Sequence, residues 1–361
     1  MINRAVPEAP LNVREYARLA QEALDPGAHS YFTGGAGDEW TLRRNEEAFE
    51  RLVLRPRVLV DVGDVTAETE LLGHTLSLPV LVAPTAMLRV AHPDGEPGVA
   101  RAAAAAGTVY TLSTLATASP AEIAAAAPAG QRWFQLYCFR DRGLNLAVID
   151  DVVEAGFTAI VLTVDVPYLG RREGDLRTGF VLPEGTYIPA FAAIAGDRGA
   201  PTPAEVIGLL DPTLTWRDVE QLAEASPVPV LVKGILSPED ARLAVDHGAA
   251  AVIVSNHGGR QLDGVPASLE ALPDVVEAVG DATPVLVDGG VRRGVDVVKA
   301  LALGASATLV GRPVVWGLAA RGEEGVRHVL ELLRDEVRLA LALAGCPTPA
   351  DVTPAHVGRV A

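Results

Sequence analysis

The sequence predicts an α/β protein, a (β/α)8 TIM barrel with an N-terminal helical extension and a long lid-like insertion after the fourth strand. Two observations carry this prediction. Eight short runs rich in β-branched residues recur along the chain, and the segments between them begin with polar residues and stop at glycine, as helices do. Near-continuous apolar runs are expected of strands buried on both faces, as in a parallel sheet covered by helices.

The eight runs predict strands at 78–85, 108–114, 132–137, 159–165, 229–235, 251–256, 284–290 and 307–313. We expect the barrel to occupy residues 78–345, which fits the usual size of about 250 residues. An open doubly wound sheet is the second choice. The barrel is preferred because no GxGxxG motif follows the first strand, while polar residues stand at the C-terminal end of nearly every strand.

Two segments lie outside this repeat, and we expect the whole chain, 1–361, to form a single domain. The N-terminal extension, 1–77, carries a predicted helix near Val13–Leu24 and the segment 31–45, which we expect to cover part of the barrel. An insertion at 179–212, rich in Pro, Gly and Ala, follows the fourth strand. Loops of this length in compact domains are often lids or partly disordered segments.

Composition excludes several classes of function. Lys and Arg number 30 against 46 Asp and Glu, a formal net charge of −16, which argues against nucleic acid or an anionic membrane as a partner. The two cysteines, Cys138 and Cys346, have no metal-ligand spacing, so neither a disulfide framework nor a metal site is expected. No apolar run approaches the ~18 residues of a spanning helix, and we expect a cytoplasmic location.

Polar residues at the strand ends are the candidates for one functional site. In chain order they are Pro84, Thr85 and Ala86, then Ser113, Gln135, Tyr137, Thr163, Asp165, Lys233, Ser255 and His257, and finally Asp288, Gly289, Gly290, Gly311 and Arg312. A single polar strand end is more often a satisfied cap than a catalyst. In a barrel, however, all eight ends meet at one mouth, and together they predict a site there.

The last two strands end in DGGVRRG and GRP, glycines followed by a helix start and by Arg292 and Arg312. Backbone N–H groups and guanidinium groups in this position form a phosphate cradle in many such barrels. The alternative is that the glycines only make tight turns. We expect a phosphorylated cofactor or substrate.

Lys233 ends the fifth strand in an apolar setting, where an ammonium group is unfavourable unless it meets negative charge. From its position alone it is a candidate for a Schiff base, for pairing with a phosphate, or for stabilising an anionic ring. His257 is the best candidate for a general base or acid, since the pKa of histidine lies near neutrality. Arg260 on the same loop is suited to a substrate carboxylate, and Asp165 to orienting His257.

These motifs, SNHGGRQLDGVP, PTAM, FQLY, LTVDVPYLGRRE, LVKGI and DGGVRRG, resemble the FMN-dependent α-hydroxy-acid oxidases and dehydrogenases, from about Tyr16 to Pro354. The resemblance implies FMN as the cofactor, with contacts from Pro84–Ala86, Ser113, Gln135, Thr163, Lys233 and Ser255. It implies that the phosphate lies on Asp288–Arg292 and Gly311–Arg312, which agrees with the predicted cradle. Lys233 then stabilises the anionic reduced ring, and the Schiff base is dropped.

The resemblance also implies how an L-2-hydroxy acid is held. Arg172 and Arg260 would bind its carboxylate, Tyr31 and Tyr137 would position it, and His257 would take a proton while Asp165 stabilises the imidazolium. Oxygen is the preferred electron acceptor, giving a 2-oxo acid and hydrogen peroxide. Two alternatives stay open: a dehydrogenase that passes electrons to a quinone or another carrier, and a redox-neutral FMN- or phosphate-binding isomerase.

One position departs from the plant glycolate oxidases. The stretch LSTLAT places Leu115 where they have tryptophan, so the pocket is expected to admit a longer or aromatic substrate side chain, although Leu115 as mere packing is the alternative. Met87 and the insertion are further candidates for the pocket wall. Asp263 is expected to fix its loop by a hydrogen bond. The resemblance also implies a homo-oligomer, a tetramer or an octamer.

Overall fold

The computed structural model describes residues 9–183, 186–189 and 208–360, and it contains a closed barrel of eight parallel strands. Around the barrel the strands follow chain order: β4 (Val80–Val82), β5 (Tyr110–Ser113), β6 (Arg132–Leu136), β7 (Ile160–Thr163), β8 (Val230–Ile235), β9 (Ala251–Val254), β10 (Val285–Asp288) and β11 (Ala307–Val310). Each lies inside one of the eight predicted ranges. The predicted barrel is confirmed.

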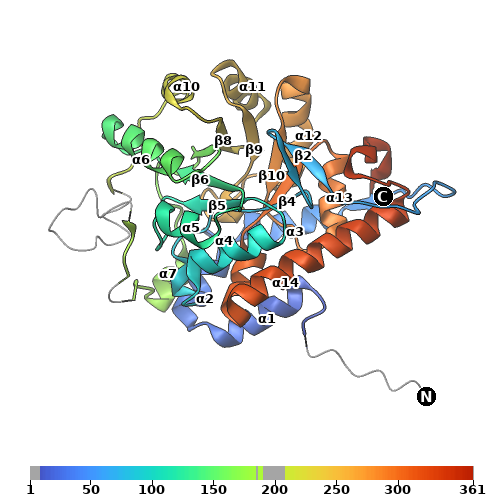
Figure 1. The fold of residues 1–361 in the computed structure, drawn as a ribbon, viewed down its shortest axis with the longest axis horizontal. Coiled ribbons are helices and arrows are strands. Elements are labelled where there is room, and N and C mark those ends of the chain that lie inside the picture. The colour runs from blue at the N-terminus through green and yellow to red at the C-terminus, as the bar shows by residue number, and fades with distance from the viewer. Residues whose placement is uncertain (1–8, 184–185, 190–207, 361) are drawn as a thin grey trace.

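Helices surround the barrel, and each strand feeds at least one of them (Figure 1). They are α4 (Gly95–Ala105), α5 (Pro120–Ala126), α6 (Arg142–Glu154), α7 (Glu173–Thr178), α10 (Trp216–Ala225), α11 (Pro238–Asp246), α12 (Ser268–Val279), α13 (Gly294–Ala302) and α14 (Arg312–Ala344). Local sequence explains their starts: Ser119 caps α5 with Glu122 in a capping box, and Ser237 caps α11 ahead of a proline.

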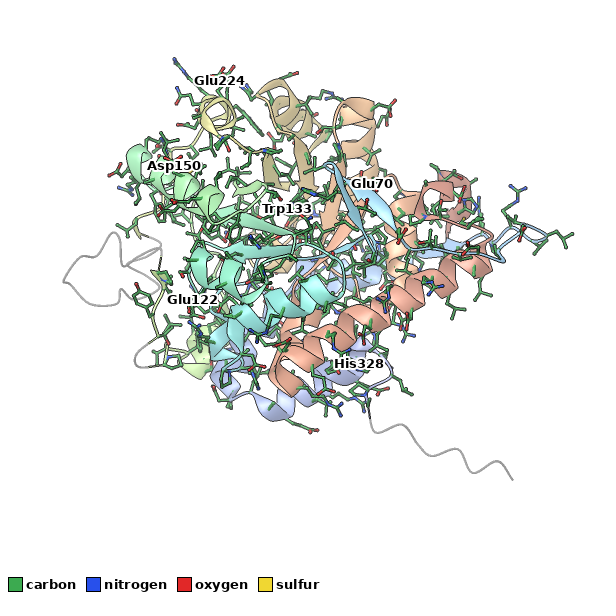
Figure 2. All side chains as sticks on the ribbon, in the orientation of Figure 1. Glu70, Glu122, Trp133, Asp150, Glu224 and His328 are labelled. Carbon is green, nitrogen blue, oxygen red and sulfur yellow. The ribbon has the colours of Figure 1, made fainter. Side chains whose placement is uncertain are left out.

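Two apolar layers hold the barrel together. Inside it, Leu81, Val161, Leu231, Ile253 and Leu286 pack with Trp133, which Figure 2 places near the middle of the molecule. A larger layer lies between the strands and the surrounding helices. The hairpin of β2 (Thr69–Leu71) and β3 (His74–Leu76) adds two buried leucines to the inner layer beside residues at the starts of the strands. Because the hairpin covers the end of the barrel where the strands start, a ligand is expected at the other end, where the strands finish.

The N-terminal extension forms α1 (Val13–Ala23), α2 (Pro26–Thr33) and α3 (Trp40–Glu50), so the helix predicted near Val13–Leu24 is confirmed. The first helix packs along α14, where the hydroxyl of Tyr16 lies 2.8 Å from Nδ1 of His328. The second contacts α7, and the third contacts the turn η3 (His257–Gly259) at the barrel mouth. The segment 31–45 thus covers part of the barrel, as expected.

Smaller elements complete the description. Strand β1 (Leu52–Leu54) pairs antiparallel with β12 (Val357–Arg359), and short 3-10 turns lie at η1 (Leu88–Val90), η4 (Gly280–Ala282), η5 (Pro349–Asp351) and η6 (Pro354–His356). Of the insertion predicted at 179–212, residues 184–185 and 190–207 lie outside the described residues, and its role as a lid stays a prediction. Both cysteines are buried and free.

Two searches of the described residues gave no candidates. None of their helices is both long enough and apolar enough to cross a membrane. Over the same ranges, no three His, Cys, Asp or Glu side chains come together in an arrangement suited to a metal ion.

Candidate active site

A cavity of about 520 Å³ opens at the C-terminal ends of the barrel strands. Most of the predicted site residues line it, namely Tyr31, Pro84, Thr85, Ala86, Ser113, Leu115, Gln135, Tyr137, Thr163, Arg172, Lys233, His257, Arg260, Asp288, Gly289, Gly290, Arg292, Gly311 and Arg312. Asp165 and Ser255 do not line it, but each is hydrogen-bonded to a residue that does. The structure therefore brings every predicted site residue to one place.

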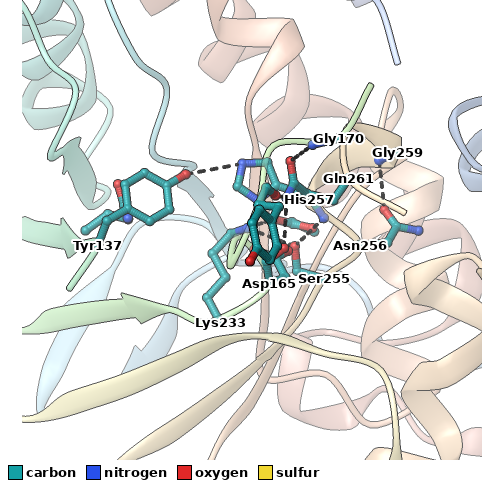
Figure 3. Close-up of polar contacts among 12 residues, drawn as sticks. Tyr137, Asp165, Gly170, Lys233, Ser255, Asn256, His257, Gly259 and Gln261 are labelled. Atoms are coloured by element: carbon teal, nitrogen blue, oxygen red, sulfur yellow. Dashed lines mark hydrogen bonds and ion pairs between the residues drawn. The ribbon is translucent and has the colours of Figure 1, made fainter. Parts of the chain in front are cut away.

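His257 lines the cavity, and hydrogen bonds to Asp165 and Ser255 fix its orientation (Figure 3). Its Nδ1 lies 2.9 Å from Oδ1 of Asp165, and its backbone N–H donates to Oγ of Ser255 at 3.0 Å. The residue has φ = +58°, a left-handed conformation that is uncommon for non-glycine residues and that often occurs at functional sites. Because Asp165 accepts the Nδ1 proton, the neutral ring presents its lone pair at Nε2.

The charges around this pair favour a neutral imidazole beside an ionised carboxylate. Burial lowers the pKa of His257, and the positive charges of Lys233 and Arg172 act in the same direction, while Asp165 opposes them. Burial by itself would raise the pKa of Asp165, but the hydrogen bond from His257 and the positive charge of Lys233 act against it, and the pKa lies below its ordinary value. His257 is thus able to accept a proton at Nε2.

Tyr137 faces the free nitrogen of His257. Its hydroxyl lies 3.5 Å from Nε2, which is long for a hydrogen bond, so Nε2 stays available to another donor. Burial raises the pKa of Tyr137, and the negative charge of Asp165 adds to the effect. The phenol therefore stays protonated and is able to donate.

Two arginines supply positive charge to the same cavity. Arg260 Nη1 donates to the carbonyls of Tyr31 at 2.6 Å and Gly34 at 3.0 Å, which leaves the Nε–Nη2 edge as a fork for a carboxylate. Burial lowers the pKa of Arg260 to about 10, so it remains charged at neutral pH. Arg172 directly precedes α7, and its buried Nε has no hydrogen-bond partner among the described residues.

Lys233 lies in the second half of β8, two residues before the strand ends at Ile235. Its Nζ donates to Oγ of Ser255 at 2.8 Å and forms an ion pair with Oδ2 of Asp288 at 3.2 Å. Burial alone would lower the pKa of Lys233, but the negative charges of Asp288 and Asp165 raise it above its ordinary value. The ammonium group is therefore charged and held by two partners.

Glycines and arginines line the far end of the cavity, after β10 and β11. Gly290 has φ = +90°, and a Cβ there would lie 2.0 Å from the carbonyl oxygen of Asn45, so only glycine fits. The guanidinium of Arg292 packs over the ring of Trp316 at 4.9 Å and pairs with Glu46 at 3.0 Å. Its Nε, although buried, has no partner in the described part of the chain.

A family model described as FMN-dependent dehydrogenase matches residues 20–359 of this sequence. The chain belongs to this family. Glycolate oxidase 1 of Zea mays is 51% identical over 353 residues, covering 96% of this chain and 95% of the relative. A peroxisomal (S)-2-hydroxy-acid oxidase of Oryza sativa subsp. japonica is 47% identical over 351 residues, covering 96% of each.

The structural comparison leads to the same family. A solved mandelate oxidase variant with (S)-mandelic acid superposes with a TM-score of 0.90 at 45% sequence identity, covering 98% of this chain and 99% of that one. A second mandelate oxidase structure, with (S)-2-phenylpropionate, gives a TM-score of 0.89 at 45% identity over 98% and 99% of the two chains. The resemblance noted in the sequence is confirmed, and the protein is an FMN-dependent enzyme.

The cavity of this chain suits FMN, the cofactor of the family. Gln135 Nε2, Thr163 Oγ1 and Asp288 Oδ1 are buried, line the cavity and have no hydrogen-bond partner among the described residues. Ser113 Oγ donates to Oε1 of Gln135 at 3.2 Å, which leaves the amide N–H group for a ligand. Buried polar groups are normally satisfied, so unpaired donors and acceptors that line one cavity indicate a polar ligand such as a flavin.

One detail of the predicted phosphate cradle changes. The predicted cradle includes Asp288, but its carboxylate forms an ion pair with Lys233 at 3.2 Å and would repel a phosphate. Its free oxygen suits a hydroxyl donor of the cofactor instead. Arg312 also has a wider role than expected, because it donates to the carbonyls of Thr33, Gly34 and Gly258 and so ties α2 to the His257 turn.

Several supporting residues were not found from the sequence. Gln261 Nε2 donates to the carbonyls of Asp165 and Tyr168, while its Oε1 accepts from Gly170 N–H, so it joins the loops after β7 and β9 (Figure 3). Asn45 and Asn256 pair through their side-chain amides. Gln261 stands inside the quoted SNHGGRQLDG motif, and its polarity there was the available signal. Asn45 carries none.

Proposed function

We propose that the protein oxidises an L-2-hydroxy acid to the corresponding 2-oxo acid and passes the two electrons through FMN to oxygen. The observation that carries the proposal is the arrangement around His257. A proton acceptor at Nε2 faces Tyr137, and Arg172 and Arg260 line the same cavity. A base beside two arginines suits a small acid whose hydroxyl carbon lies next to its carboxylate.

The two arginines are proposed to bind the carboxylate. The Nε of Arg172 is a buried donor without a partner, and Arg260 keeps one edge of its guanidinium available. Two like charges close together in a buried site are unfavourable unless an anion lies between them. The proposal assigns Tyr31, whose ring lies 5.1 Å from the guanidinium carbon of Arg260, to the positioning of that anion.

His257 is proposed to accept a proton from the substrate at Nε2. Asp165 then stabilises the imidazolium ion, because its carboxylate already holds Nδ1. Tyr137, protonated and next to Nε2, is assigned to orienting the hydroxyl group. In the balanced reaction the hydroxy acid loses two protons and two electrons, and oxygen gains both to form hydrogen peroxide.

We assign the cofactor contacts to the polar residues deeper in the cavity. FMN, when bound, supplies the two-electron acceptor. Ser113, Gln135, Thr163 and the backbone of Pro84–Ala86 are proposed to hold its ring, and Lys233, charged and supported by Ser255, to provide positive charge beside it. Gly289, Gly290, Arg292, Gly311 and Arg312 are proposed to hold its phosphate.

Oxygen as the acceptor is supported by the relatives, which are named oxidases. The test measures oxygen uptake, 2-oxo acid and peroxide on the FMN-loaded protein with a panel of 2-hydroxy acids. We expect one 2-oxo acid and one peroxide per oxygen consumed. Bleaching of the flavin without recolouring in air would instead indicate a dehydrogenase that uses another carrier.

Self-association is proposed as well. Val58 and Leu59, on the loop that follows β1, are 80% and 102% exposed, and a contact with a second copy would remove them from water. Light scattering at micromolar concentration tests this, and a monomer would contradict it. A cytoplasmic location stays a prediction from the sequence.

A further inference from the structure

An apolar wall of the cavity lies next to Tyr137, the residue that faces the proposed base His257. Tyr137, whose hydroxyl faces His257, packs against a cluster of buried Met87, Phe139, Ile188 and Leu210, with Leu115 and Ala86 against it. Met87, Leu115, Ile188 and Ala86 also line the cavity, so this cluster is both a packed layer and a surface open to a ligand. The ends of β4, β5 and β6 also carry the cofactor candidates Pro84–Ala86, Ser113 and Gln135, so the apolar wall lies beside the proposed cofactor contacts.

Met87 and Leu115 are fixed relative to each other. The N–H of Met87 donates to the carbonyl of Leu115 at 3.0 Å, which joins the loops after β4 and β5. Met87 has φ = +56° and ψ = +46°, a strained conformation for a residue with a long side chain. Such strain persists where the surroundings hold it, so the position of this side chain is strongly specified.

A buried carboxylate provides that support. Glu96 on α4 is fully buried; its Oε1 accepts the N–H groups of Leu88 at 3.0 Å and Thr117 at 2.7 Å, and its Oε2 accepts the Thr117 hydroxyl at 2.6 Å. Leu88 follows Met87, and Thr117 lies two residues after Leu115. One side chain therefore braces both loops, and the wall is preorganised before any substrate arrives.

From this geometry we propose that the wall formed by Met87, Leu115 and Ile188 selects 2-hydroxy acids with a bulky apolar side chain, such as butyl or phenyl, over glycolate. The proposal rests on the proposed function and names its substrate class. Glycolate has only hydrogen on the reacting carbon, so it leaves the wall facing water, whereas a bulky side chain covers it. Each added methylene that the wall buries is worth about fourfold in kcat/KM.

The test compares kcat/KM for anaerobic flavin reduction by glycolate, lactate, 2-hydroxybutanoate, 2-hydroxyhexanoate and mandelate. Three methylenes separate 2-hydroxyhexanoate from lactate, so we expect a ratio of about sixtyfold between them, with glycolate slowest. Equal constants across the series, or glycolate the fastest, would overturn the substrate class but leave the proposed function standing. No reduction by any of the acids would overturn the proposed function itself.

A variant and a binding measurement tie the preference to the wall. Leu115→Trp fills the space beside Tyr137, and the ratio of 2-hydroxyhexanoate to lactate should fall at least tenfold. Leu146→Trp, at an exposed position on α6, is the matched control and should keep the wild-type ratio. Calorimetry with phenylacetate and acetate, which do not react, should show tighter binding of phenylacetate in the wild type and a smaller difference in Leu115→Trp. An unchanged ratio and unchanged binding would show that Leu115 is packing only.

Discussion

His257 and Asp165 lie 92 positions apart in the sequence, yet Nδ1 of the first is 2.9 Å from Oδ1 of the second. They follow β9 and β7, which are separated in the barrel by β8. The barrel brings these two strand ends to one mouth. The side chain of Gln261, on the loop after β9, donates a hydrogen bond to the carbonyl of Asp165, on the loop after β7. The pairing determines which nitrogen of His257 carries the lone pair, and therefore which side of the ring accepts a proton.

The first prediction concerns the pH dependence of flavin reduction. His257 must be neutral to accept a proton, so kcat/KM should fall as the pH drops through its pKa and level off above it. Because burial lowers that pKa, the midpoint should lie below 6.5, the ordinary value for histidine. Stopped-flow reduction between pH 5 and 9 measures the profile, and a midpoint above the ordinary value would contradict it.

Asp165→Asn should move this profile in a defined direction. The carboxylate is the group that raises the pKa of His257 against burial, so its removal should shift the midpoint to lower pH. The maximum rate should drop as well, since the imidazolium loses its partner. The same stopped-flow titration gives both values, and an unshifted midpoint with an unchanged maximum would remove Asp165 from its role.

Arg172→Gln should weaken the substrate interaction. A hydrogen bond to a charged group contributes about 1.5–3 kcal/mol, so kcat/KM should fall by about tenfold to a hundredfold. Arg177→Gln on the same helix is the control, because Arg177 is 81% exposed and pairs only with Glu173 among the described residues. Steady-state kinetics on both variants distinguishes a lost substrate contact from a general effect on α7. Equal losses of kcat/KM in the two variants would indicate the general effect.

Lys233→Met should destabilise the protein more than the double variant Lys233→Met with Asp288→Asn. The single change leaves the Asp288 carboxylate buried without its partner, at a cost of about 3–5 kcal/mol, and the double change removes both charges. Urea unfolding of the cofactor-free proteins measures the difference. If the double variant is the less stable of the two, the ion pair is not the reason for the loss.

Asp263→Ala should loosen the third helix of the N-terminal extension. Its carboxylate accepts the N–H groups of Asp38, Trp40 and Thr41 at the start of α3, a helix cap supplied from 222–225 residues away. The loss of such a cap costs about 0.5–2 kcal/mol, whereas the exposed Asp64→Ala should be neutral. These bonds lower the pKa of Asp263 against burial, so its contribution should persist at neutral pH and vanish as the pH falls through the folded value.

Much of the fold and of the site was predictable because both depend on local patterns. Runs such as 159–165 and 251–256 are apolar along their whole length, which is typical of strands buried on both faces, and their last residues then had to meet at the mouth. On that basis Asp165 could be proposed as the partner of His257, provided that the barrel brought the two within hydrogen-bond reach. Most of the candidate residues from Ser113 to Arg312 line one cavity for the same reason, and Asp165 and Ser255 are hydrogen-bonded to residues that do.

The contacts of α3 could not be predicted, because they join residues far apart in the sequence without a repeating pattern. The pairing of Glu46 with Arg292, the cap from Asp263 and the amide pair of Asn45 with Asn256 all depend on how the extension packs on the barrel. The positive φ of His257 and the ion pair between Lys233 and Asp288 likewise follow from tertiary packing.

The most direct measurement of the central claim is the rate of anaerobic flavin reduction in His257→Gln, compared with the wild type and with His74→Gln as a control on the hairpin at the opposite end of the barrel. A positioned general base contributes about a hundredfold to ten-thousandfold. We predict that His257→Gln binds FMN, remains folded and loses reduction by at least a hundredfold, while the control keeps the wild-type rate. A His257→Gln protein that is reduced at the wild-type rate would contradict the assignment of His257 as the proton acceptor.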